Sequence, residues 1–227
     1  MKKLMHYLEI AADTLFFVFF VQAFVVQAFV VPTSSMEETL LIGDHVLVNK
    51  MYYAPTATKL ERFILPVGEL KRGDIVVFKF PQDPRFDFVK RAIGLPGDVI
   101  EIRDKVLFVN GKAVDEPYVI HRDYNVYNYE NSFPELARRD NFGPVKVPEG
   151  YIFVLGDNRD NSNDSRFWGF LPIENLRGRP WVIYWSIKKS SREYAYHNIL
   201  EWAVGTVVSI LEIPFRTRWS RILRVPH

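Results

Sequence analysis

Three short segments of the chain carry side chains that could do nucleophilic or acid–base chemistry. Residues 32–36, Pro-Thr-Ser-Ser-Met, hold three hydroxyl groups in a row, residues 88–98 place Lys90 within an apolar run, and residues 156–166 are densely polar. Each segment also fits an ordinary structural role: a Ser/Thr-rich linker, a strand lysine whose amine reaches water, and a solvated turn. Whether they do chemistry depends on whether the fold brings them together.

A serine beside a neutral lysine is the pairing that would make these segments an active site. A serine hydroxyl is a poor nucleophile unless a neighbouring base takes its proton. The five histidines lie in no recognisable triad setting, and no Gly-x-Ser-x-Gly turn is present. Lys90 could supply the base, because Phe88, Val89 and Ile93 would shield it from water and favour its neutral form.

Other chemistries find little support in the sequence. The absence of cysteine excludes disulfides, thiolate metal sites and a cysteine nucleophile. A calcium loop beginning at Asp160 would need glycine and glutamate where Ser165 and Leu171 stand. The Ser-x-x-Lys pattern at residues 186–189 lacks the companion motifs of penicillin-binding enzymes. We therefore expect no metal and no organic cofactor. With 29 basic against 27 acidic residues, the charge does not indicate a nucleic-acid partner.

The N-terminal region, residues 1–31, is predicted to be a cytoplasmic tip followed by a transmembrane anchor. Two lysines precede an apolar stretch from Ile10 to Val31, which is long enough to cross a bilayer if Asp13 lies near the headgroups. Basic residues before this stretch and acidic ones after it put the N-terminus in the cytoplasm and the rest outside. A cleaved secretory signal peptide has the same charge order, but its apolar core is usually shorter and an Ala-x-Ala site closes it. The anchor is therefore favoured.

Beyond the anchor the composition is typical of a mainly β protein. Runs of β-branched and aromatic residues bounded by Gly, Pro and Asp occupy residues 45–48, 74–80, 151–155 and 181–185. Asn110-Gly111 between two apolar runs predicts a β-hairpin, because both residues accept the positive φ of a type I′ turn. We divide this region into a catalytic β core, residues 32–98 and 148–187, interrupted by an inserted subdomain at residues 99–147.

Residues 188–227 are predicted to form an amphipathic C-terminal segment. Apolar residues from Ile199 to Leu211 follow helical spacing, with a narrow polar stripe. The apolar part is shorter than a membrane span requires. A helix lying on the membrane surface or packed on the domain is therefore favoured over a second span.

Taken together, these segments resemble the type I signal peptidases, the membrane-bound serine proteases of bacterial secretion. Ser35-Met36 is similar to the family's nucleophile motif, residues 88–98 to its lysine box, and residues 156–166 to its Gly-Asp-Asn-x-x-x-Ser-x-Asp-Ser-Arg box. Residues 41–44 and 72–76 match the strand-forming boxes between them. The resemblance covers the chain from the anchor to about Ser186, and five boxes in the right order are highly specific.

The resemblance implies a fold and a set of residue roles. The fold would be an antiparallel coiled-sheet catalytic domain with an inserted β-hairpin subdomain, one N-terminal transmembrane helix and a short C-terminal helical segment. Ser35 would be the nucleophile and Lys90 its general base, with Ser162 holding the lysine amine toward Ser35. The Thr33 hydroxyl, at a position where some relatives have serine, would join the Ser35 N–H in the oxyanion hole.

Two further groups of residues follow from the same resemblance. Shallow apolar pockets that select small side chains, as at an Ala-x-Ala site, would be lined by Phe29, Val31, Met36, Leu40, Phe88 and Val89. The scaffold of the site would be formed by Asp157, Asn158, Arg159, Asp164 and Arg166, with a buried bidentate Asp–Arg pair between Asp164 and Arg166 or nearby partners.

The function implied is a membrane-anchored serine endopeptidase that removes signal peptides from exported preproteins through an acyl-enzyme. Its partners would be those signal peptides, the phospholipid membrane and a nearby secretion translocon. The catalytic part would lie on the outer, periplasmic side of the bacterial cytoplasmic membrane. Two alternatives remain open: a maturation peptidase of the same superfamily with a restricted substrate, and a membrane-anchored β module that binds an exported partner without catalysis.

Overall fold

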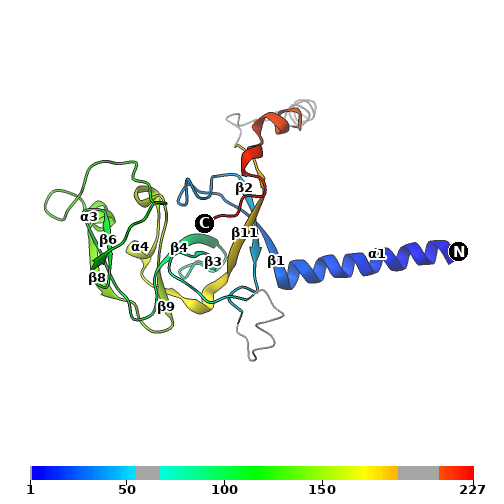
Figure 1. The fold of residues 1–227 in the computed structure, drawn as a ribbon, viewed down its shortest axis with the longest axis horizontal. Coiled ribbons are helices and arrows are strands. Elements are labelled where there is room, and N and C mark those ends of the chain that lie inside the picture. Colours follow the sequence, from blue (N-terminus) through cyan, green and yellow to red (C-terminus); the bar gives the residue numbers. More distant parts are fainter. Residues whose placement is uncertain (1, 55–66, 189–209) are drawn as a thin grey trace.

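A helix that stands away from a β-rich body gives the molecule its shape (Figure 1). The structure, a computed structural model, describes residues 2–54, 67–188 and 210–227. Helix α1 (Lys2–Phe20) continues into a π-helical turn, η1 (Val21–Val25), and strand β1 (Val26–Val30) follows directly. Lys3–Val25 is the one helix among these residues that is long and apolar enough to cross a membrane, and its most apolar stretch has no buried residue.

The predicted span from Ile10 to Val31 is wrong at its C-terminal end. Val21–Val25 and Val26–Val30 have the identical sequence Val-Gln-Ala-Phe-Val, yet the first copy is helical and the second is a strand. The second copy pairs antiparallel with β2 (Asp44–Asn49), which satisfies its backbone groups. Val31 is buried in the core and Phe29 packs against it. Tertiary pairing therefore ends the helix at Val25, and residues 26–30 of the predicted anchor belong to the sheet.

The larger part of the body is a seven-stranded antiparallel sheet in the order β1-β2-β11-β3-β4-β9-β10. Its remaining strands are β3 (Ile75–Lys79), β4 (Asp87–Gly94), β9 (Tyr151–Leu155), β10 (Leu171–Pro172) and β11 (Leu176–Ser186). Short helical turns lie between β9 and β11: η2 (Arg159–Asn161), α4 (Ser165–Trp168) and η3 (Ile173–Asn175). The apolar cores pack on both faces of this sheet, so β4, whose last six residues are all buried, runs through the interior.

A second, four-stranded sheet lies between β4 and β9 in the chain and at the opposite end of the body from α1 (Figure 1). It has the order β7-β6-β5-β8, built from β5 (Val99–Arg103), β6 (Val106–Val109), β7 (Lys112–Ala113) and β8 (Phe142–Lys146), with helix α3 (Pro134–Asp140) before β8. Asn110 and Gly111 join β6 to β7 with positive φ angles of 52° and 76°, as the hairpin motif predicts.

The end of the chain packs back on the catalytic sheet. Of the predicted C-terminal helix, most lies outside the described residues; residues 210–216 are helical, and the turn η4 (Trp219–Arg221) follows. Ile183 on β11 exchanges backbone hydrogen bonds with Leu223 and Arg224. Arg221 reaches Asp44 at the start of β2 with a 2.6 Å ion pair. The last eleven residues therefore belong to the body of the protein.

Candidate active site

Ser35 lies on a buried turn between β1 and β2. Leu40 N–H donates to Met36 O at 2.7 Å and Glu37 N–H to Ser34 O at 3.0 Å, so the chain turns tightly just after Ser35. Met36 and Leu40 are both fully buried in the core that also holds Val31. These apolar anchors fix the turn on both sides of Ser35, whose side chain is itself almost entirely buried.

Lys90 reaches this turn from the middle of β4. Its Nζ lies 2.7 Å from Ser35 Oγ and donates to Val89 O at 3.0 Å, and the residue is only 4% exposed. Burial lowers the pKa of Lys90 from 10.5 to about 8, against the pull of Asp164 and Asp157, because an ammonium group loses its hydration there. The structure therefore brings together the serine and lysine that the sequence predicted, with the pKa of the amine lowered to about 8.

Thr33 and Ser162 lie beside this pair with different geometry. Thr33 Oγ1 is 3.4 Å from Ser35 Oγ, on the same turn. Ser162 is buried, but the predicted hydrogen bond to Lys90 is not found among the described residues, where the Ser162 hydroxyl has no partner of normal geometry. It lies near the Asp164 carboxylate, whose pKa it helps to lower.

Gly156 packs closely against both the Ser35 carbonyl and the Ser162 hydroxyl. A Cβ atom at this position would lie 2.3 Å from Ser162 Oγ and 2.5 Å from the Ser35 carbonyl oxygen. Only a residue without a side chain allows so close an approach. The Ser162 hydroxyl is therefore placed against the nucleophile turn, although it is not bonded to Lys90.

The predicted scaffold residues form buried ion pairs. Arg166 and Asp164 make a bidentate pair at 2.8 Å, as expected, and both side chains are at most 1% exposed. Burial alone would raise the pKa of Asp164, but the Arg166 guanidinium holds it below its usual value. Asn158 donates its backbone N–H to Ser35 O at 3.1 Å and its side-chain amide to Ser34 O at 3.2 Å. The loop after β9 thus holds the backbone of the nucleophile turn through these two hydrogen bonds.

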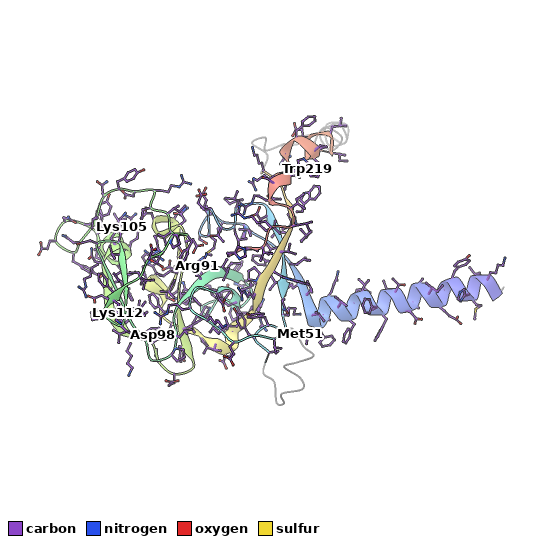
Figure 2. The ribbon with its side chains drawn as sticks, viewed as in Figure 1. Met51, Arg91, Asp98, Lys105, Lys112 and Trp219 are labelled. Carbon is purple, nitrogen blue, oxygen red and sulfur yellow. The ribbon has the colours of Figure 1, made fainter. Side chains whose placement is uncertain are left out.

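Arg91, a central scaffold residue, was missed by the sequence analysis. It follows Lys90 on β4 and makes a bidentate pair with Asp157 at 2.8 and 2.7 Å in the interior of the body (Figure 2). Thr39 completes this cluster through a 2.6 Å hydrogen bond to Asp157. The signal was available: two adjacent cations in an apolar strand point to opposite faces, so both faces of that strand must accommodate a charge.

A cleft of about 420 Å³ opens beside Ser35 and Lys90. Five of the six predicted pocket residues line it: Phe29, Val31, Met36, Phe88 and Val89. Leu40 does not, because it is fully buried in the core. Phe86, Asn161 and Asn163, which the sequence analysis did not assign, also line the cleft, and the two asparagines add polar amides to its wall. The described residues hold no group of three or more acidic or histidine side chains that could bind a metal ion.

Comparison with known proteins finds relatives of one family over most of the chain. A family model described as "Signal peptidase, peptidase S26" matches residues 4–185. Signal peptidase I of Pseudomonas fluorescens is 36% identical over 197 residues, covering 76% of this chain and 69% of the relative. The Aquifex aeolicus enzyme is 37% identical over 220 residues, covering 77% and 81%. A solved signal peptidase I from Enterococcus faecalis is 36% identical, with a TM-score of 0.40 over 49% of this chain and 96% of that one.

Proposed function

Because this chain belongs to the signal peptidase family, peptidase S26, and is therefore a serine endopeptidase that cleaves signal peptides, we propose that Ser35 is its nucleophile and Lys90 its general base. The observation that carries this proposal is the 2.7 Å contact between Lys90 Nζ and Ser35 Oγ in a buried site. Burial of this amine lowers the pKa of Lys90 to about 8, which favours its neutral form.

The reaction begins when neutral Lys90 accepts the Ser35 proton as Oγ attacks the scissile carbonyl. The oxygen of the tetrahedral intermediate becomes negative and is stabilised by the Ser35 N–H and the Thr33 hydroxyl. The Lys90 ammonium then returns its proton to the departing amine, which leaves an acyl-enzyme on Ser35. A water molecule, deprotonated by Lys90, hydrolyses this ester and restores the serine.

The cleft supports an extended substrate with small side chains near the scissile bond, as in an Ala-x-Ala site. β4 pairs with β9 only from Arg91 onward, so the edge of Asp87–Lys90 that does not face β3 is open for a substrate strand. β1 is the edge strand of the sheet, and Phe29 from it shares the cleft with Phe88. We expect these two aromatic side chains to favour a small substrate side chain between them.

The apolar helix supports anchorage in the bacterial cytoplasmic membrane, with the N-terminus inside. Lysines begin the chain, whereas the catalytic body follows the span and would lie on the outer side, where signal peptides emerge from the translocon. A reporter fused after His227 should then be active only in the exported compartment. Activity in the cytoplasm would contradict this orientation.

The test of the nucleophile compares Ser35 with the adjacent Ser34, which serves as the matched control. The full-length protein in detergent should cleave a preprotein with an Ala-x-Ala site, and Ser35→Ala should abolish this cleavage. Ser34→Ala should retain most of it, because Ser34 Oγ bonds to exposed Asn161 rather than to Lys90. The reverse ranking would move the assignment by one residue and contradict the proposed role of Thr33.

A further inference from the structure

The chain between β7 and α3 leaves the inserted subdomain and returns to the loop after β9, residues 156–166 (the catalytic loop), before it enters α3. Ile120 forms a parallel bridge with Asn158: its N–H donates to Asp157 O at 3.0 Å, and its carbonyl accepts from Arg159 N–H at 3.2 Å. Residues 116–123 therefore lie along the loop that grips Ser35, although the chain reaches them through a different sheet. The predicted boundary of the subdomain separates these two segments, and the structure joins them.

Two side chains of this segment hold the arginines behind the nucleophile. Glu116 pairs with Arg159 at 2.6 Å, and the two side chains are only 7% and 3% exposed. The ring of Tyr118 lies 3.8 Å from the guanidinium of Arg91, while its hydroxyl donates to Glu116 at 2.9 Å. Tyr118 thus connects the Arg91–Asp157 pair to the Glu116–Arg159 pair.

The contact with Ser35 runs through the backbone of the catalytic loop. Arg159 Nε donates to Gly156 O at 3.2 Å, and Gly156 is the residue against which the Ser35 carbonyl packs. Asn158, between them, donates its N–H to that same carbonyl. A shift of Arg159 would therefore move both groups that fix the Ser35 backbone, and with them the N–H that faces the developing oxyanion.

We propose that Glu116 and Tyr118 are positioning residues for the nucleophile, so that this part of the insertion is a component of the catalytic centre. The inference rests on the proposed Ser35–Lys90 mechanism. Its physical basis is the cost of leaving a buried guanidinium unpaired: without Glu116, Arg159 must turn toward water or find another acceptor, and the loop moves with it. A displacement of about 1 Å at a reacting group lowers turnover by about 10²-fold.

The test measures kcat per functional Ser35, counted by titration with an acylating ester, in the full-length protein. Glu116→Gln should lower kcat by about 10–100-fold while KM changes little, because Glu116 does not line the cleft. Tyr118→Phe keeps the ring over Arg91 and removes only the bond to Glu116, so its kcat should fall less. Glu116→Asp should recover part of the activity lost in Glu116→Gln.

Glu101→Gln is the matched control, since it breaks an ion pair of the same inserted subdomain on its exposed surface, with Arg103. Its kcat should stay at the wild-type level. If Glu116→Gln and Tyr118→Phe both keep wild-type kcat per titrated serine and lose only thermal stability, the pair is structural and the proposal is overturned. A wild-type protein that cleaves no preprotein would instead contradict the proposed function itself.

Discussion

Lys90 and Arg91 are neighbours on β4 and both are buried. Their side chains point to opposite faces of the strand, where they have different partners. Among the described residues, Lys90 Nζ has no carboxylate within ion-pair distance; it donates to the Ser35 hydroxyl and the Val89 carbonyl and lies 5.5 Å from the centre of the Phe88 ring. Arg91 has Asp157, two carbonyl oxygens, Thr39 and the Tyr118 ring. One face therefore keeps a cation ready to lose its proton, and the other keeps a permanent cation in place. The proposed catalytic base, Lys90, is thus adjacent in the strand to Arg91, whose buried ion pair stabilises the fold.

The largest expected effect is on the Lys90 face. Lys90→Met should lower turnover of an Ala-x-Ala preprotein by at least about 10³-fold, because it removes the base. Lys90→Arg should be as inactive, since a guanidinium remains protonated. Substantial turnover by Lys90→Arg, measured on purified full-length protein, would show that Lys90 is only a structural charge and would remove the contrast between the two faces.

The next largest effect is on the Arg91 face and concerns stability. Arg91→Met leaves the buried Asp157 carboxylate unpaired and should lower the free energy of unfolding by about 3–5 kcal/mol. Asp157→Leu combined with Arg91→Met should recover much of this loss, because the remaining charge is then removed as well. Chemical denaturation of the single and double variants measures both values. A neutral Arg91→Met would mean that this face does not depend on its ion pair.

The pH dependence of the two properties follows from the pKa of Lys90. Burial lowers this pKa to about 8, so the folded state binds the proton less tightly than the unfolded state, whose value is 10.5. Turnover should rise with pH through about 8. Wild type should be about 3 kcal/mol less stable than Lys90→Met below pH 8, and the difference should fade as the pH rises to 10.5. Denaturation curves at pH 7, 9 and 11 test the sign; a difference independent of pH would contradict it.

The smallest effects come from removing one hydroxyl on each face. Thr39→Val deletes a bond to Asp157 and should cost about 1 kcal/mol of stability with little change in turnover. Ser162→Ala deletes a hydroxyl with no partner of normal geometry, so stability should change less, while turnover falls because Ser162 lies against Ser35 at Gly156. Paired measurements of melting temperature and kcat distinguish the two, and equal profiles would weaken the division between the faces.

The sequence predicts the reactive side chains of the site better than the ion pairs that hold them in place. The pairing of Ser35 with Lys90 could be predicted because the local sequence around each residue is specific, and the structure places Lys90 Nζ 2.7 Å from Ser35 Oγ. The partner of Asp157 was not, because an ion pair between residues far apart in the chain depends on strand register. The end of the anchor was misplaced for the same reason: Val21–Val25 and Val26–Val30 are identical, so local propensity cannot distinguish them. Only pairing with β2 makes the second copy a strand.

Leu40 illustrates the limit of assigning residues by resemblance alone. The resemblance assigned it to the substrate pocket, yet the turn places it in the core, where it packs in one cluster with Met36 instead of lining the cleft. The inserted segment shows the opposite error. Its irregular composition gave no periodic signal, and the Glu116–Arg159 pair that joins it to the catalytic loop is invisible without the fold.

Because residues 21–30 are a tandem repeat, insertion or deletion of one copy would change the length of the anchor. Gain or loss of one five-codon unit would change the helix by about 7.5 Å at 1.5 Å per residue. The copy next to Val31 would still enter β1 with the same side chains in the same register. Bilayers of different organelles and organisms differ in thickness by several ångströms. A single duplication or deletion could therefore refit the protein to another membrane without altering a residue of its catalytic sheet.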